Sequence, residues 1–471
     1  MPLESPEETL GKYRNFVTII DQKKGRNFTL FLRSLLVFFD DWDEITPLEA
    51  RSLWLRALDK LGRHGWYALY LGMPYCKTRC SYCVYNSFEL KTQDQLETYS
   101  NNLIKEMQFF APLFNDVKFE SFYFGGGTPS LLEPDGLDRI FGTTFGMFKL
   151  IPGAEKSIEF TPLSTTTEKL EVAKKWGVNK VSFGVQSLNR KVLDIANRQE
   201  QETRHVEFAL QEARRLGFKN INVDLIMGLT GDTEESFLDT FRRVAAMGPT
   251  RISIYPLQPL KNYIERAGES SDEIGQRVRT MLANVSEDLL GIAKEHDFLI
   301  SGKMAITKDV TNWGFTHKSL MNERGAYFFD NPAMHGCIGF GPISISRAKD
   351  MFWYQQETHL GHRLDVPFDP TSRTYRKREM SARTNMVAYV LDCLSSPDGI
   401  MELATFREKF GVDFREVFQE TVNDLETLGR AKTDDGKFRL TTDAHKEAFI
   451  SCMFFFDMDK IEEKMRRITT S

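Results

Sequence analysis

Short apolar segments of strand length alternate with longer segments of helical periodicity between residues 66 and 257. The predicted strands cover residues 66–73, 119–124, 157–160, 180–186, 220–227 and 251–257, and the helices between them cover 93–110, a segment beginning near 133, 165–176, 201–216 and 234–247. This alternation is typical of a parallel sheet joined by right-handed helical crossovers. Six such units predict a closed or nearly closed α/β barrel.

The barrel is flanked by segments of different character. Residues 1–65 read as a helical N-terminal extension with two apolar stripes, at 28–39 and 53–61. A charged helical segment covers 272–296, and an irregular, aromatic-rich segment covers 313–353. The predicted domains are the extension (1–65), the barrel with its substrate-wall segment (66–350), a linker (351–375) and a C-terminal unit (376–471). Helices followed by a strand near 437–441 make the last unit winged-helix-like, and we interpret it as a lid or docking domain.

Composition excludes several classes of protein. Of 471 residues, 41% are hydrophobic and 27% charged, which is ordinary for a soluble protein. A net charge of -5 argues against a general nucleic-acid surface. No apolar run reaches the length of a membrane span, and the acidic N-terminus lacks the features of a signal peptide. We therefore expect a cytoplasmic monomer that binds neither nucleic acid nor membrane.

Three cysteines follow the first predicted strand. Cys76, Cys80 and Cys83 form a Cys-x3-Cys-x2-Cys triplet. Soft thiolates packed this closely are typical ligands of an iron–sulfur cluster, and three ligands leave one iron of a four-iron cluster uncovered. The alternative is a structural zinc site with a fourth ligand from elsewhere, although the paired Cys-x2-Cys or Cys/His patterns of such sites are absent.

Polar and glycine residues gather at or just beyond the ends of the other strands. In parallel α/β barrels the active site is built at this rim. Asp224 lies inside its strand, where an inward-pointing carboxylate needs partners. The residues at the strand ends are Gly125, Gly126, Gly127, Thr128, Glu159, Gln186 and Gln258.

Taken together, these motifs resemble those of the radical S-adenosylmethionine (SAM) superfamily, and within it the oxygen-independent coproporphyrinogen III oxidase-like branch. The resemblance covers residues 66–350 closely and the C-terminal unit more loosely. The motifs, in the order in which the family has them, are Tyr70-x3-Pro-Tyr-Cys, the cysteine triplet, Gly-Gly-Gly-Thr-Pro, Ser-Phe-Gly-Val-Gln-Ser, Asn-Arg-Gln and Asn-Val-Asp-Leu-Ile-x-Gly-Leu.

The resemblance implies that Cys76, Cys80 and Cys83 hold a 4Fe–4S cluster whose open iron is chelated by SAM. One electron would then cleave SAM to a 5′-deoxyadenosyl radical, with a flavodoxin or ferredoxin as the electron donor. The glycine triplet would let the backbone approach the methionine moiety. The remaining cofactor contacts implied are Glu159 to the ribose, Arg198 to the methionine carboxylate, Gln186 and Asp224 to the same cavity, and Tyr70 and Tyr85 beside the cluster loop.

Two departures from the porphyrinogen oxidases shape the leading hypothesis. Position 72 is glycine where those enzymes commonly carry histidine, and position 85 is tyrosine where a further cysteine commonly follows the triplet. Other members of the branch bind two SAM molecules, one as radical source and one as methyl donor. We therefore expect a radical methyltransferase or a cyclopropanating methylene transferase. Its substrate would be a small molecule or natural product, planar or apolar, and the reaction would take place at an unsaturated carbon of that substrate.

Two alternatives remain open at this stage. One is oxidative decarboxylation of coproporphyrinogen III, and the other is a non-catalytic haem chaperone. His335 is the one candidate haem ligand and is also a candidate acid or base. Ile338 is a candidate for packing against the second SAM molecule.

Overall fold

The computed structural model describes residues 5–14, 42–85, 87–258, 260–305, 311–317, 334–356, 364, 366–371, 375–394, 399–441 and 445–456. The chain forms two compact units. The larger unit contains the described residues from 42 to 378, and the smaller contains residues 5–14 together with the described residues from 379 onward.

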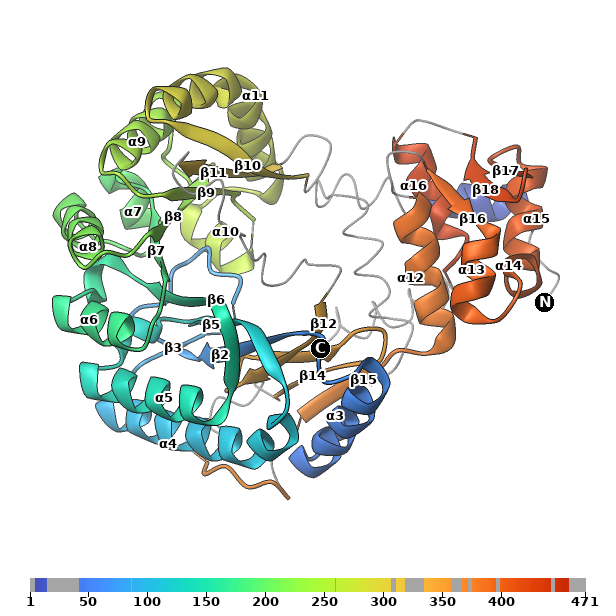
Figure 1. The fold of residues 1–471 in the computed structure, drawn as a ribbon. Coiled ribbons are helices and arrows are strands. Elements are labelled where there is room, and N and C mark those ends of the chain that lie inside the picture. Colours follow the sequence, from blue (N-terminus) through green and yellow to red (C-terminus); the bar gives the residue numbers. More distant parts are fainter. Residues whose placement is uncertain are drawn as a thin grey trace. The chain divides into compact units, whose positions relative to one another are not determined.

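Six parallel strands in sequence order form the centre of the larger unit (Figure 1). They are β2 (Trp66–Met73), β5 (Lys118–Gly126), β6 (Lys149–Phe160), β7 (Lys180–Gln186), β8 (Asn220–Met227) and β9 (Arg251–Pro256). Each pairs in parallel with the next. The predicted six-unit α/β architecture is therefore confirmed.

The same sheet continues beyond both outer members of this set. The strand β12 (Met334–Phe340) pairs in parallel with β2 and is followed outward by β13 (Ile345–Ala348), β14 (Phe352–Gln356), β15 (Tyr375–Glu379) and β1 (Asp43–Ile45). Beyond β9 lie β11 (Thr311–His317) and β10 (Phe298–Ala305), both antiparallel to their neighbours. Because the strand order ends at β1 and β10, the described sheet is an open barrel. The expectation of an irregular segment at 313–353 is wrong for its described residues, which are mostly strands.

Helices cover the outer side of the sheet (Figure 1). The helix α3 (Pro47–Leu61) starts at a capping box in which the Thr46 hydroxyl accepts from the Glu49 amide. A long helix, α11, precedes the β10–β11 hairpin. The helices of this unit are α3 (Pro47–Leu61), α4 (Gln93–Phe110), α5 (Pro134–Met147), α6 (Thr167–Lys175), α7 (Arg190–Ile195), α8 (Thr203–Arg215), α9 (Glu234–Ala246), α10 (Lys261–Ala267) and α11 (Ser271–Glu295).

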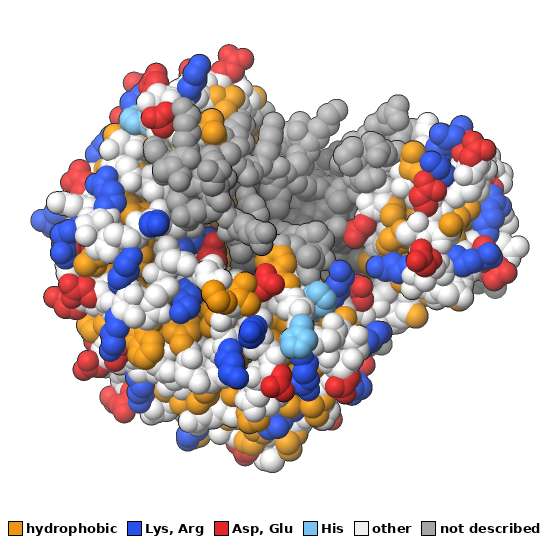
Figure 2. Space-filling model, in the orientation of Figure 1, with side chains coloured by type: hydrophobic (Ala, Val, Ile, Leu, Met, Phe, Trp, Pro, Cys, Tyr) orange, Lys and Arg blue, Asp and Glu red, His pale blue; other side chains and the backbone are white. Residues whose placement is uncertain are grey.

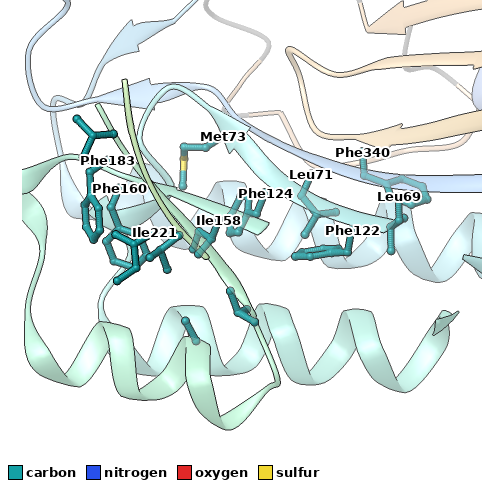
Figure 3. Packing of buried hydrophobic residues seen from close by; sticks show 14 of the residues in the cluster. Leu69, Leu71, Met73, Phe122, Phe124, Ile158, Phe160, Phe183, Ile221 and Phe340 are labelled. Carbon is teal, nitrogen blue, oxygen red and sulfur yellow. The ribbon is translucent and has the colours of Figure 1, made fainter. Parts of the chain in front are cut away.

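Apolar side chains of the strands point toward these helices and form the core (Figure 3). Successive side chains of a strand point to opposite faces. Phe122 and Phe124 of β5 therefore face the helices, while Tyr123 between them faces the barrel interior. The residues labelled in Figure 3 are Leu69, Leu71, Met73, Phe122, Phe124, Ile158, Phe160, Phe183, Ile221 and Phe340. The interior face of the same strands is left for polar side chains.

The smaller unit has the helix and strand order of a winged helix. Its elements are α12 (Ala382–Leu394), β16 (Ile400–Glu402), α13 (Leu403–Phe410), α14 (Phe414–Val417), α15 (Gln419–Thr427), β17 (Ala431–Asp434), β18 (Lys437–Leu440) and α16 (His445–Met453). The helical residues 6–14 pack on it, with the Tyr13 ring 4.9 Å from that of Phe454. The stripe expected at 28–39 lies outside the described residues.

The described surface has no broad region of positive charge on the face drawn in Figure 2, where basic and acidic side chains are interspersed. In the winged-helix-like unit, α15 carries Glu420, Asp424 and Glu426 and no lysine or arginine. A helix of this charge is unsuited to a phosphate backbone. Among the described residues, no helix is both long and apolar enough to cross a bilayer.

Candidate active site

The cysteine loop is closed at its base by a short parallel pairing. The strands β3 (Tyr75–Cys76) and β4 (Phe88–Glu89) pair directly after β2 ends. Their contact is extended by hydrogen bonds from the Phe88 amide to the Pro74 carbonyl and from the Leu90 amide to the Cys76 carbonyl, each 2.8 Å. The loop that carries the three cysteines is thus held at both ends.

A second set of contacts holds the loop against the turn that follows α7. The Ser81 amide and hydroxyl donate to the carbonyls of Ala196 and Ile195, at 3.2 and 3.1 Å. The Asn197 side chain donates to the Arg79 carbonyl at 2.9 Å. Asn197 has a φ of 60°, a left-handed backbone conformation that is uncommon for residues other than glycine. This conformation accompanies the hydrogen bond from its side chain to the cysteine loop.

All three cysteines line a cavity of about 500 Å³, within the usual range for ligand sites. The Cys76 thiol accepts a hydrogen bond from the Thr128 hydroxyl at 3.5 Å, and the Cys80 sulfur lies 3.3 Å from Nη1 of Arg198. Burial raises the pKa of the Cys76 thiol to about 11. Metal binding at this thiol must therefore displace its proton.

The glycine triplet is required by close approach of the backbone. The Gly127 amide donates to the Met73 carbonyl at 2.7 Å, and a Cβ at position 127 would lie 2.5 Å from the Tyr75 carbonyl oxygen. Gly126 has a φ of 110°, which other residues rarely adopt. The triplet thus joins β5 to the start of the cysteine loop.

Two carboxylates face the cavity from neighbouring parts of the sheet. Glu159 accepts from the Tyr123 hydroxyl at 2.5 Å and from the Gly126 amide at 3.1 Å. Burial raises the pKa of Glu159 to about 7, close to neutrality. Asp224 accepts from Ser182 and from Asn222, each at 2.8 Å. Burial also raises the pKa of Asp224.

Arg198 connects the cysteine loop to β7. Its Nη2 donates to the Gly184 carbonyl and to the Gln201 side chain, both at 2.6 Å. Its Nε is buried and has no hydrogen-bond partner among the described residues. Gln186, beside it in the cavity wall, has a φ of 70° at a bulge between β7 and β8. Strained residues of this kind are frequent at ligand sites.

Most of the residues selected from the sequence lie around this one cavity, and a few do not. Gly125 and Tyr70 do not line it; the Tyr70 ring is 8% exposed and stacks on Tyr123 at 6.0 Å. The selected residues that line the cavity are Cys76, Cys80, Cys83, Tyr85, Gly126, Gly127, Thr128, Glu159, Gln186, Arg198, Asp224 and Gln258.

His335 and Ile338 lie on β12 and do not line the cavity. Nδ1 of His335 accepts a 3.0 Å hydrogen bond from the Trp66 amide at the start of β2. The cysteine loop follows the other end of β2, about 23 Å away along an extended strand. The geometry therefore gives no support to His335 as an acid, base or haem ligand. Ile338 is a buried core residue.

Sequence reasoning missed a belt of polar side chains inside the barrel. On β7, β8 and β9 every second residue lines the cavity, and the missed members are Lys180, Ser182, Asn222, Arg251, Ser253 and Tyr255. The belt is hydrogen-bonded internally, from Ser253 to Asn222 at 3.0 Å and from Asn222 to Ser182 at 2.8 Å. The signal was present in the sequence, because these residues interrupt apolar strands with a period of two.

Comparison with known proteins matches the part of the chain that forms most of this cavity to a known family. Residues 70–244, which carry the cysteine loop, the glycine triplet, Glu159, Arg198 and Asp224, match the model of the radical SAM superfamily. This part of the chain is therefore a radical SAM domain. Curated relatives that the chain matches are named oxygen-independent coproporphyrinogen III oxidase.

The relatives differ in how much of the chain they match. The chain is 34% identical to oxygen-independent coproporphyrinogen III oxidase of Salmonella typhimurium over 188 residues, which are 40% of this chain and 41% of that protein. It is 24% identical to the Synechocystis enzyme of the same name over 372 residues, covering 77% of this chain and 78% of the relative. Coproporphyrinogen III oxidase from Escherichia coli, a radical SAM enzyme, has the same fold, with a TM-score of 0.64, 22% identity and coverage of 86% and 93%.

Radical SAM enzymes use a 4Fe–4S cluster and SAM, and the residues of this cavity fit both. Among the described residues, no three acidic, histidine or cysteine side chains group around one point as a single zinc ion would require. Cys76, Cys80 and Cys83 all line this one cavity, where each thiolate could bind a different iron of a cluster. The unpartnered Nε of Arg198 suits an anionic cofactor group.

Proposed function

We propose that this radical SAM enzyme carries out oxidative decarboxylation of a porphyrinogen of the coproporphyrinogen III type. The observation that carries the proposal is the similarity to coproporphyrinogen III oxidases over more than three quarters of the chain. The methyl or methylene transfer that the sequence led us to expect becomes the second candidate. The supply of electrons would come from a carrier such as flavodoxin or ferredoxin.

When bound, the cluster and SAM supply an organic radical that can remove a hydrogen atom from an unactivated carbon. The cysteine loop would hold the cluster through Cys76, Cys80 and Cys83. Arg198 would pair with the methionine carboxylate through its free Nε, and Glu159 would accept from the ribose hydroxyls. The rigid base of the loop and the glycine turn would keep these groups aligned and exclude water from the reacting carbon.

The proposed reaction changes the propionate side chains of the substrate and conserves atoms and electrons. Each propionate side chain that becomes a vinyl group loses one hydrogen atom, one electron and carbon dioxide. The enzyme-bound radical takes the hydrogen atom, and a one-electron acceptor must take the electron. The cavity walls nearest the strands are polar, which suits a substrate that carries carboxylates.

The chain departs from the porphyrinogen oxidases at Gly72 and Tyr85, and the local structure at these two positions favours methyl or methylene transfer. A Cβ at Gly72 would lie 3.0 Å from the Ile343 side chain and 3.2 Å from the Ser344 amide, so a histidine cannot be placed there without rearrangement. Tyr85 lines the cavity and is 55% exposed. A second SAM molecule would then occupy part of the remaining volume and supply the transferred carbon.

One anaerobic assay separates the two candidates. The reconstituted enzyme is given a chemical reductant, coproporphyrinogen III, a one-electron acceptor and SAM that is deuterated in its methyl group. Decarboxylation predicts a vinyl product, carbon dioxide and 5′-deoxyadenosine without deuterium.

Methyl or methylene transfer predicts deuterium in 5′-deoxyadenosine and a deuterated one-carbon unit on an unsaturated substrate that the enzyme accepts. Intact coproporphyrinogen III after SAM cleavage, with no vinyl product, would reject the first candidate. Stoichiometric haem binding without any SAM cleavage would reject both candidate reactions and favour a non-catalytic haem chaperone.

A further inference from the structure

Arg251 is a cation in the cavity wall that neither the cofactor contacts nor the fold accounts for. It begins β9, and its side chain lines the cavity together with those of Ser253 and Tyr255. Its Nε is buried and has no hydrogen-bond partner among the described residues. No described carboxylate forms an ion pair with it. A buried, unsatisfied donor on a charged group is costly, and such groups are usually completed by a ligand.

The other two cations of the cavity have partners within the protein. Lys180 forms a 3.1 Å ion pair with Glu155, and both side chains are largely buried. Arg198 donates to Gly184 and Gln201 and faces the cysteine loop. Among the described residues of the cavity wall, Arg251 is therefore the cation that has neither an internal ion pair nor a proposed cofactor contact.

The two carboxylates of the cavity are also engaged elsewhere. Glu159 is bound by Tyr123 and Gly126, and Asp224 by Ser182 and Asn222. Neither forms an ion pair with Arg251. An incoming anion would consequently not compete with either of these two carboxylates for the guanidinium.

The position of Arg251 separates it from the cofactor rim. The residue precedes Tyr255 by four positions on β9, about 13 Å along the strand. The cysteine loop and Gln258 lie at the other end of the parallel strands, beyond their carboxyl ends. A ligand that reaches both ends must therefore be elongated, with its anionic group remote from the reacting carbon.

We propose that Arg251 binds a carboxylate of the substrate and so fixes which end of the molecule lies under the cofactor. The identity of the carboxylate as a tetrapyrrole propionate rests on the proposed function, but the anionic subsite itself does not. A guanidinium matches a carboxylate in geometry, because two parallel N–H groups meet two oxygens. The side chains of Ser182, Asn222 and Ser253, which hydrogen-bond to one another, line the same cavity.

The test uses coproporphyrin III, the stable oxidised tetracarboxylate, and its neutral tetramethyl ester as probes. Both are titrated against the anaerobically reconstituted enzyme, with binding followed by fluorescence. We expect Arg251→Gln to weaken binding of the tetracarboxylate at least tenfold and to leave ester binding unchanged, since a charged hydrogen bond is lost. Arg251→Lys should retain part of the affinity. Iron content and melting temperature establish that each variant is folded.

Arg204→Gln is the matched control. Its side chain is 72% exposed on α8, pairs with Glu202 and does not line the cavity. It should bind both probes as the wild type does. Equal tetracarboxylate affinities for wild type and Arg251→Gln would overturn the proposal.

A failure of the proposed function gives a different pattern. If the wild type binds neither tetrapyrrole probe, benzene-1,3,5-tricarboxylate replaces them and thermal stabilisation of the enzyme is measured. Stabilisation that is lost in Arg251→Gln and kept in Arg204→Gln would uphold the carboxylate subsite with another substrate. No stabilisation of the wild type would overturn the subsite as well.

Discussion

The Tyr123 hydroxyl donates a 2.5 Å hydrogen bond to Oε1 of Glu159, and the two residues stand on the neighbouring strands β5 and β6. The second oxygen of Glu159 accepts from the amide of Gly126, the last residue of β5. A single carboxylate thus links the strand that ends in the glycine triplet to the strand beside it. Its protonation state should influence both stability and cofactor binding.

Replacement of Glu159 by glutamine should change how stability depends on pH. Its pKa is about 7 in the folded chain against an ordinary 4.5, mainly because of burial. The wild type should therefore lose stability relative to Glu159→Gln as pH rises from about 4.5 through 7, by about 2 kcal/mol after allowance for water in the cavity. Chemical unfolding of the SAM-free protein at several pH values measures this. Parallel pH curves for the two proteins would contradict it.

Gly127→Ala should destabilise the start of the cysteine loop. The added methyl group would lie 2.5 Å from the Tyr75 carbonyl oxygen, so the backbone must move, at a cost of about 2 kcal/mol. We expect a lower melting temperature and less bound iron. Gly146→Ala in α5 is the control, because no atom lies within 4 Å of its added Cβ. That variant should be unchanged or slightly more stable.

Each of the three loop cysteines should be needed for iron. Alanine at Cys76, Cys80 or Cys83 should abolish the visible absorbance of the cluster and all SAM cleavage. Cys393→Ala, in α12 of the winged-helix-like unit, should keep both. Full iron content in a variant of the loop would show that the assigned ligand is wrong.

His335→Ala should lower stability without changing the chemistry. Loss of the Nδ1 acceptor leaves the Trp66 amide without this bond, at a cost of about 1 to 3 kcal/mol. The rate of SAM cleavage per intact cluster should equal that of the wild type. His64→Ala, at an exposed position, serves as control for stability. A stable His335→Ala protein that has lost SAM cleavage would restore a catalytic role to this histidine.

Much of the barrel could be predicted because its local signals agree with the fold. The strands at 66–73, 180–186 and 220–227 and the helix at 93–110 were predicted with the bounds that the structure has. Their apolar side chains alternate toward the helices, and caps or glycines mark their ends. The cavity residues at the strand ends followed from the same topology.

The remainder depends on long-range contacts. The strand β12 contains Gly336 and Gly339, which weaken its local strand signal, and it pairs with the edge that β2 offers, while β13 and β14 follow outward from it. His335 looked reactive in isolation, and its role follows from the Trp66 amide, 269 residues away. In the sequence Arg251 is simply the first residue of a strand, and only the structure shows that its Nε is buried in the cavity wall without a partner among the described residues.

The packing of residues 6–14 on the winged-helix-like unit has a consequence for how that unit can be obtained alone. Tyr13 meets Phe454 and Arg14 meets Glu447 at 3.3 Å, so the two ends of the described chain complete one apolar core. A fragment that starts at residue 379 would leave the surface under Tyr13 bare. The same fragment joined to residues 5–14 through a short flexible linker would cover that surface again and is the form to express.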